Sequence, residues 1–225
     1  MSDRPDLDLL AERYARVRAS LPPHVKLIAV SKKRTVDEIK ALYDLGHRDF
    51  GENYPQELRD KHPLLPADIN WHFIGHIQSN KVKYIAPAAG LVHTVDGERI
   101  LLELNKRAAA LGRSLPVLLQ VHIASEETKH GFSEDEIYPF LKGFDPKRMA
   151  NIEVCGLMGM ATNTADRDRV RSEFRGLKRL FDRLRSQYPA LEMRELSMGM
   201  SGDADIAIAE GSTMVRIGTA IFGER

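Results

Sequence analysis

Lys32 is the residue whose type and position say most about chemistry. It follows the apolar, β-branched run Leu27-Ile28-Ala29-Val30-Ser31, which is typical of a buried parallel strand. A lysine at the end of such a strand loses hydration, and desolvation favours its neutral amine. A neutral lysine amine is a nucleophile toward carbonyl carbon. The run therefore predicts a Schiff-base lysine.

A second cluster runs from Leu196 to Asp203 and is typical of a strand that passes through a glycine-containing turn into a helix. Its glycines allow the backbone to approach a ligand closely. Ser201 and the first helical N–H groups can bind an anion there. The alternative is that Ser201 only caps the helix.

A third cluster is the apolar strand from Thr213 to Ile217, which carries Arg216 and continues into Gly218 and Thr219. Together with the second cluster it resembles the phosphate site found after the last two strands of barrel enzymes. Arg216 could instead be a paired structural residue. A strand-end lysine beside a phosphate site predicts a phosphorylated aldehyde as ligand, and pyridoxal 5′-phosphate meets both requirements.

Short apolar strands that alternate with amphipathic segments must position these residues. The expected strands are 26–30, 49–50, 70–74, 91–94, 116–123, 152–158, 193–196 and 213–217. The expected helices are 7–21, 36–45, 55–61, 80–86, 98–111, 134–141, 167–188 and 203–210. About eight βα units predict a single (β/α)8 TIM barrel with an extra N-terminal helix, as one domain over residues 1–225. An open doubly wound sheet is the alternative.

The composition is that of a water-soluble globular protein. The chain has 225 residues, of which 43% are hydrophobic and 29% charged, and its net charge of +1 provides no general attraction to nucleic acid or to a membrane. Cys155 lies in an apolar run and is predicted to be a packed strand residue of a protein from a reducing compartment. No signal sequence or membrane-spanning window is present, so a cytoplasmic protein is expected. A monomer is expected because the sequence shows no second domain to exchange across an interface.

The sequence resembles the pyridoxal phosphate homeostasis protein family, whose barrel is similar to the N-terminal domain of bacterial alanine racemase. The motifs that carry the resemblance span most of the chain: Ala29-Val30-Ser31-Lys32, Phe50-Gly51-Glu52-Asn53-Tyr54, Trp71-His72-Phe73-Ile74-Gly75, Gln78-Ser79-Asn80-Lys81, Leu196 to Ser201, and Val215 to Gly223.

The resemblance implies that pyridoxal phosphate is the cofactor and assigns its binding to Lys32, Asn53, Ser201, Arg216, Gly218 and Thr219. Lys32 would hold the aldehyde as a Schiff base. Ser201, Gly218 and Thr219 would bind the phosphate, and Arg216 would face the pyridine nitrogen. A cation there disfavours protonation of this nitrogen, which makes the cofactor a weak electron sink. Such a site suits holding the cofactor better than demanding carbanion chemistry.

Alanine racemase-like enzymes carry a second domain that supplies a tyrosine base, and this chain ends directly after its last predicted strand. We therefore predict a non-enzymatic role in intracellular pyridoxal phosphate homeostasis, in which the protein holds the cofactor and releases or delivers it. Apo forms of pyridoxal phosphate enzymes are the class of recipient that this role allows. The alternative is an amino-acid racemase with Lys32 as one base. A serine hydrolase using Ser201 is a remote alternative, because Asp203 replaces the last glycine of a nucleophile elbow.

Lys129 lies past the long strand 116–123, in a segment where the family also has a lysine before a small turn. It could receive the aldehyde during transfer, with Glu126 accepting a proton, or it could be a solvated loop lysine. His72 and His76 could line the pocket, although hydrogen-bonded structural roles are at least as common for such histidines. No set of potential ligands has metal-binding spacing, so a metal site is not expected.

Overall fold

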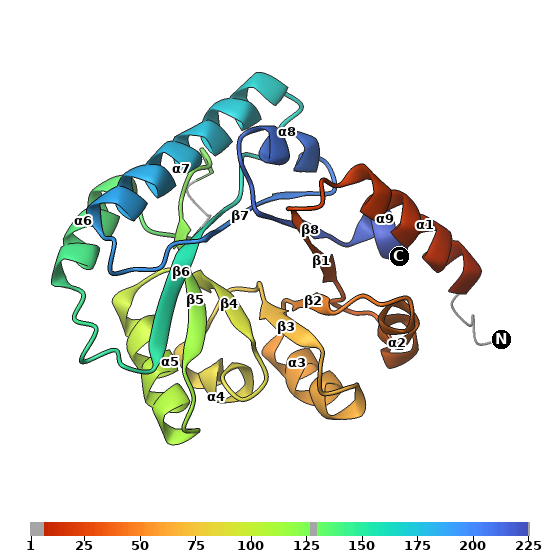
Figure 1. Cartoon of the computed structure of the whole chain (residues 1–225), viewed down its shortest axis with the longest axis horizontal. Helices are drawn as coiled ribbons and strands as arrows, with labels where there is room; N and C mark the ends of the chain where they lie inside the picture. Colours follow the sequence, from red (N-terminus) through yellow and green to blue (C-terminus); the bar gives the residue numbers. More distant parts are fainter. Residues whose placement is uncertain (1–6, 127–129, 225) are drawn as a thin grey trace.

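Parallel strands form a closed barrel in the computed structural model, which describes residues 7–126 and 130–224 (Figure 1). The strands are β1 (Lys26–Val30), β2 (Asp49–Glu52), β3 (Asn70–Phe73), β4 (Leu91–Val95), β5 (Leu115–Val121), β6 (Ile152–Gly159), β7 (Glu195–Met200) and β8 (Met214–Ile217). Each strand pairs with its neighbour in sequence, and β1 pairs with β8. This last pairing confirms the predicted (β/α)8 barrel and excludes the open sheet.

The helices surround the barrel (Figure 1). They are α1 (Leu7–Ser20), α2 (Val36–Asp44), α3 (Pro55–Lys61), α4 (Val82–Ile85), α5 (Glu98–Ala110), α6 (Glu134–Gly143), α7 (Arg167–Gln187), α8 (Ala204–Ala209) and α9 (Thr219–Phe222), with the 3-10 turns η1 (His62–Leu64) and η2 (Ser79–Lys81). The predicted extra N-terminal helix is α1, which packs beside α9. Among the described residues, no helix has both the length and the apolar character needed to cross a membrane.

Two apolar layers stabilise the barrel, because both faces of its strands are covered. The outer layer lies between strands and helices and includes Trp71, Phe73 and Phe174. A smaller cluster contains Ile28, Leu91, Leu118, Cys155, Met158 and Met214. Cys155 is therefore a buried strand residue, as predicted, and burial raises the pKa of its thiol to about 12.

The predicted end of β7 was wrong. The strand was expected to stop at Leu196, but it starts at Glu195 and continues to Met200. The reason is Gly199, which has a φ of +94° inside the strand, where the register with β8 shifts. A glycine that appeared to mark a turn is a bulge within the strand. Ser197 is consequently a buried strand residue and lies inside the fold.

Two helical segments also differ from expectation. The segment 80–86 is not one helix, because a 3-10 turn, η2, precedes the short α4. Helix α9 was not predicted and begins at Thr219, immediately after Gly218. The N–H groups of Ile221 and Phe222 donate to the Gly218 carbonyl at 2.9 Å, so only the first N–H groups of α9, at Thr219 and Ala220, lack an acceptor within the helix.

Candidate functional site

The C-terminal ends of β7, β8, β1 and β2 lie side by side. Met200 is opposite Arg216 across β7 and β8, and Val30 is opposite Gly51 across β1 and β2. Because β1 and β8 also pair, the loops after these strands form one continuous arc. This arc carries most of the predicted binding residues: Lys32, Asn53, Ser201, Gly218 and Thr219.

Lys32 lies in the turn between β1 and α2, two residues after the strand ends, and is half-buried. The sequence predicted a lysine enclosed at the strand end. Instead Ser31 occupies the buried position, and the chain turns at Lys33, whose φ is +59°. Left-handed backbone is uncommon for a residue with a side chain. The turn must therefore be held by its surroundings.

Two carboxylates hold the turn on either side of Lys32. Glu57 Oε2 accepts a hydrogen bond from the Lys33 backbone N–H at 2.6 Å. Glu52 Oε1 accepts one from Ser31 Oγ, also at 2.6 Å. The Ser31 N–H in turn donates to the Gly51 carbonyl at 2.9 Å. The backbone that presents the Lys32 amine is thus fixed from β2 and α3.

Lys61 completes this network from the last residue of α3. Its Nζ donates to Glu52 Oε1 at 2.8 Å, to Glu57 Oε2 at 2.6 Å and to the Ser31 carbonyl at 2.9 Å. Glu52 is fully buried, and burial outweighs the attraction of Lys61, so that the pKa of Glu52 is raised to about 7. Sequence reasoning missed this network. The available signal was a glutamate that directly follows apolar strand residues.

Asn53 follows β2, and its Oδ1 is shielded from solvent without a hydrogen-bond partner among the described residues. A buried acceptor left unsatisfied costs about 1–3 kcal/mol. A ligand with a hydroxyl or N–H donor would satisfy it. This unfilled acceptor beside Lys32 is the observation that best fits a small polar ligand at the arc.

Gly75 fixes the backbone of Asn53 by direct contact. A Cβ at Gly75 would lie 1.9 Å from the Asn53 carbonyl oxygen, and Gly75 cannot retreat freely because its own carbonyl accepts a 2.6 Å hydrogen bond from Thr94 Oγ1. We expect Gly75→Ala to lower the free energy of unfolding by about 1–3 kcal/mol and to weaken ligand binding at Asn53. Urea unfolding and a ligand titration measure both effects.

The matched control is Gly143→Ala, because a Cβ at Gly143 meets nothing within 4 Å. That substitution is expected to change stability by less than about 0.5 kcal/mol. Equal losses in the two variants would contradict the steric account.

Arg216 is buried in the barrel on β8. Its Nη1 donates to Ser197 Oγ at 2.6 Å, and its Nη2 donates to the Gly159 carbonyl at 3.2 Å. Burial lowers the pKa of Arg216 to about 10, an effect that the charge of Asp203 partly offsets. Arg216 therefore stays cationic at neutral pH. Both acceptors are neutral groups of the barrel interior, so Arg216 has structural partners as well as the position predicted for a ligand contact.

The two loops after β7 and β8 are accessible. Ser201 and Thr219 are exposed, and Gly218 is half-buried. A Cβ at Gly218 would lie 3.2 Å from the Val30 carbonyl oxygen, so a glycine here allows the closest approach to β1. The alternative of an N-cap role for Ser201 was wrong, because the N-cap of α8 is Asp203.

A cavity of about 500 Å³ opens between the loops that follow β6 and β7. Met200, Gly202 and Asp203 line one side of it, and Thr162 and Asn163 line another. Lys32 is not among its lining residues. The cavity therefore adjoins the Ser201 loop.

Glu126 joins the loops after β5 and β6. Its Oε1 accepts a hydrogen bond from the Asn163 backbone N–H at 3.0 Å, and its carbonyl oxygen is 2.9 Å from His122 Nε2. Lys129, the predicted second amine, lies outside the described residues. The role suggested for this pair stays a prediction.

The histidines separate into two environments. His72 is buried in the barrel interior, whereas His76 is exposed at the rim, 3.4 Å from Asp96 Oδ2. His76, Asp96 and His130 offer potential ligand atoms within 4.8 Å of one another, a grouping that sequence spacing did not indicate. The two rings stack at 4.0 Å with 19° between their planes. Imidazole lone pairs lie in the ring plane, so stacked rings do not point at one common ion.

The chain matches the family model described as the alanine racemase N-terminal domain over residues 6–225. A relative named Pyridoxal phosphate homeostasis protein, from Synechocystis sp. (strain ATCC 27184 / PCC 6803 / Kazusa), is 37% identical over 94% of this chain and 97% of its own. The protein of the same name from Vibrio alginolyticus is 42% identical over 91% of this chain and 88% of its own.

Solved structures agree with these relationships. PipY from Synechococcus elongatus PCC7942, in a form with PLP bound, is 35% identical with a TM-score of 0.84, and the match covers 95% of this chain and 100% of PipY. Alanine racemase from Clostridium difficile 630 is only 16% identical, with a TM-score of 0.75 over 97% of this chain and 56% of the racemase, and shares the fold. The chain belongs to the pyridoxal phosphate homeostasis proteins within the alanine racemase N-terminal domain family.

Proposed function

We propose that this protein binds pyridoxal 5′-phosphate at the C-terminal end of its barrel and serves intracellular homeostasis of that cofactor. The observation that carries the proposal is the arc in which Lys32 lies between the unfilled acceptor of Asn53 and the glycine-containing loop of Gly218. The names of the relatives and the PipY structure with PLP support the same ligand.

Each residue of the arc has a separate task in this proposal. Lys32 supplies the amine that bonds to the aldehyde carbon of the ligand, with release of one water. Ser201, Gly218 and Thr219 bind the phosphate, where α9 presents backbone N–H groups. Asn53 accepts a hydrogen bond from the ligand. Bound pyridoxal phosphate supplies an electron-withdrawing pyridine ring conjugated to the aldehyde.

Arg216 would face the ring nitrogen and keep it unprotonated. The two acceptors that its guanidinium contacts among the described residues, Ser197 Oγ and the Gly159 carbonyl, are neutral, so it offers the ring a cation. A cation beside the nitrogen raises the free energy of the protonated ring. This arrangement favours retention and release of the cofactor over rapid turnover of amino acids.

The proposal extends to transfer and location. Glu126 and Lys129 would take part in passing the cofactor to apo forms of pyridoxal phosphate enzymes. The cytoplasm suits this role, and its reducing environment keeps the free thiol of Cys155 intact.

Borohydride trapping on the wild-type protein tests the proposal. Reduction converts a C=N linkage into a stable amine, so we expect a yellow protein to be bleached and one cofactor mass to appear on the peptide containing Lys32. Pyridoxal without the phosphate should bind more weakly, because the loops at Ser201 and Thr219 then lose their ligand. A protein that stays colourless with added pyridoxal phosphate would refute the proposal.

A further inference from the structure

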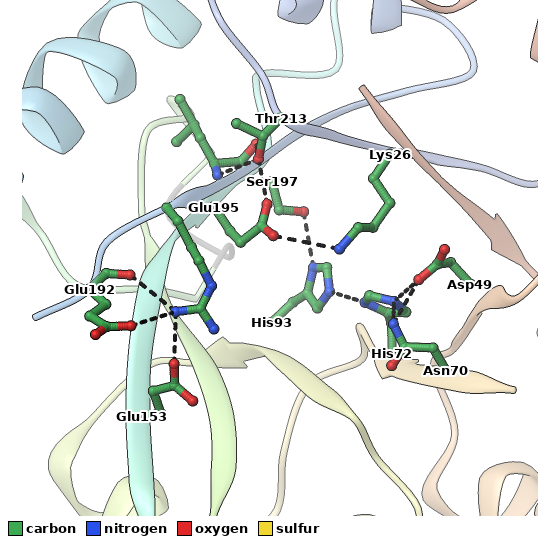
Figure 2. A network of polar contacts seen from close by, with 12 residues as sticks. Lys26, Asp49, Asn70, His72, His93, Glu153, Glu192, Glu195, Ser197 and Thr213 are labelled. Atoms are coloured by element: carbon green, nitrogen blue, oxygen red, sulfur yellow. Dashed lines mark hydrogen bonds and ion pairs between the residues drawn. The ribbon is translucent and has the colours of Figure 1, made fainter. Parts of the chain in front are cut away.

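A continuous chain of hydrogen bonds crosses the barrel interior from Arg216 to Asp49. Arg216 Nη1 lies 2.6 Å from Ser197 Oγ, which is 3.0 Å from His93 Nδ1. His93 Nε2 is 2.9 Å from His72 Nδ1, and His72 Nε2 is 3.0 Å from Asp49 Oδ1. Figure 2 shows the part of this chain from Ser197 to Asp49. The chain links β8, β7, β4, β3 and β2.

The two ends of this chain of hydrogen bonds lie on β2 and β8, the strands on either side of β1. Asp49 is the first residue of β2, whereas Arg216 lies opposite Met200, where β7 ends. Ser197, His93 and His72 are buried, and the Asp49 side chain is 24% exposed. Water therefore reaches only the Asp49 end of this polar path.

The chemistry of the donors fixes the direction of donation along this chain of hydrogen bonds. Arginine can only donate, so Ser197 Oγ accepts from Arg216 and directs its own hydrogen to His93 Nδ1. Burial holds the pKa of His93 well below its ordinary value, so this ring is neutral, and with Nδ1 accepting from Ser197 its proton is on Nε2. That proton is donated to His72 Nδ1. His72 then carries its proton on Nε2 and donates it to Asp49.

Burial lowers the pKa of His72 as well, although its hydrogen bond to Asp49 acts in the opposite sense, so the second ring is also neutral. Burial tends to raise the pKa of Asp49, but its contacts with His72 and Asn70 outweigh burial, and the carboxyl stays ionised. Asn70 Nδ2 donates to Asp49 Oδ1 at 2.7 Å. Lys26 and Glu195, 3.5 Å apart, are further charges beside this network (Figure 2).

Hydrogen-bond donation in the opposite direction, from Asp49 toward Ser197, is unfavourable while Asp49 is ionised. Asn70 Nδ2 lies 3.1 Å from His72 Nε2, but the bare Nε2 would still face the ionised Asp49 Oδ1 at 3.0 Å, two acceptors against each other. The opposite direction would also make both His93 and Arg216 donate to Ser197 Oγ, whose own hydrogen would then need another acceptor. The negative charge of Asp49 therefore selects the Nε2–H form of both histidines.

We infer that Asp49 is a positioning residue for Arg216: through His72 and His93 it keeps the Ser197 oxygen available as the acceptor that holds the guanidinium. The effect on the cofactor rests on the proposed function, in which Arg216 faces the ring nitrogen. The chain of hydrogen bonds itself does not depend on any ligand.

The first test is the tautomer of each histidine in 15N-labelled protein without cofactor, measured by long-range 1H–15N correlation. We expect His72 and His93 to carry the proton on Nε2. In Asp49→Asn the charge is lost, so the Nδ1–H form should become populated in both rings and the Arg216 guanidinium resonances should shift. Asp68→Asn, which removes an exposed carboxylate paired with Arg48, is the matched control and should change neither.

A second variant separates the two halves of the chain. Ser197→Ala removes the acceptor of Arg216 but leaves the contact between His72 and Asp49. We expect the Arg216 resonances to shift while His72 keeps its proton on Nε2. Both Asp49→Asn and Ser197→Ala should release pyridoxal phosphate about fivefold faster than the control, since Arg216 loses one hydrogen bond.

The outcomes are distinguishable. Histidines that keep the same tautomers in Asp49→Asn would overturn the inference. So would changed tautomers with unshifted Arg216 resonances, because Asp49 would then not act on Arg216. A protein that fails to bind pyridoxal phosphate, yet shows the expected resonance shifts, would remove the proposed function and leave the role of Asp49 established.

Discussion

Replacing Lys32 by alanine is expected to abolish covalent capture of pyridoxal phosphate. Lys32 lies in the turn that Glu52 and Glu57 fix after β1, and it is half-buried, whereas the adjacent Lys33 is exposed. The phosphate loops remain in Lys32→Ala, so weak non-covalent binding should persist. We expect no cofactor mass after borohydride reduction and a loss of affinity of at least about tenfold, which corresponds to 1.4 kcal/mol. Mass spectrometry and an absorbance titration measure the two effects.

Lys33→Ala is the matched control, because Lys33 is the adjacent lysine and its side chain is exposed. Its backbone N–H, which bonds to Glu57, is retained in the variant. This control should still be labelled by borohydride. Labelling of Lys32→Ala at wild-type level would show that another amine holds the cofactor.

Lys61→Met should be the most destabilising substitution in the network of Glu52, Glu57 and Lys61 that holds the turn at Lys32. Lys61 Nζ is the cation bound to the fully buried Glu52, and removing one member of a buried ion pair costs about 3–5 kcal/mol. The Ser31 carbonyl loses a donor at the same time. We expect this loss in urea unfolding near pH 8, together with weaker retention of the cofactor at Lys32.

The loss should depend on pH in a defined direction. The pKa of Glu52 is about 7 in the folded protein and 4.5 as its ordinary value. Between these values the folded state holds a proton that the unfolded chain releases, so the contribution of Glu52 to stability falls as the pH rises. Without Lys61, ionised Glu52 is more costly still. Lys61→Met should therefore be closer to the wild-type stability near pH 5 than near pH 8.

Glu52→Gln in the Lys61→Met background provides the control, because it removes the fully buried one of the two carboxylates that lose Lys61. The double variant should recover most of the stability lost at high pH. A single variant that is destabilised equally at both pH values, with no recovery in the double variant, would show that packing of Lys61 matters and its charge does not.

The sequence allowed the barrel to be predicted because its strands are short, apolar and separated by amphipathic helices. The end of β7 could not be predicted, since a glycine in a turn and a glycine in a bulge look alike along the chain. Gly199 becomes a bulge only because β8 lies beside it. The helix α9 was missed for a related reason, as four residues carry too little periodicity.

The candidate site was predictable where a residue follows a strand, as Lys32, Asn53, Ser201 and Gly218 do. The hydrogen bonds that hold these residues in place were not predictable, because they depend on the register between strands that are distant in sequence. His93 and Ser197 are 104 positions apart, yet their side chains are 3.0 Å apart. A polar residue inside a buried strand indicates that a hydrogen-bond partner is needed. It does not reveal which residue is that partner.

The turn at Lys33 has a consequence for how such barrels diverge. Its left-handed backbone is held by Glu57, and Glu57 and Lys61 belong to α3 in the outer ring. The backbone that carries Lys32 is thus held from α3 and β2, whereas the cavity beside the Ser201 loop is shaped by the segments after β6 and β7. Mutations that reshape that wall can accumulate without disturbing the backbone that carries Lys32. The scaffold is therefore modular, and new ligands can evolve around a nucleophile that stays in place.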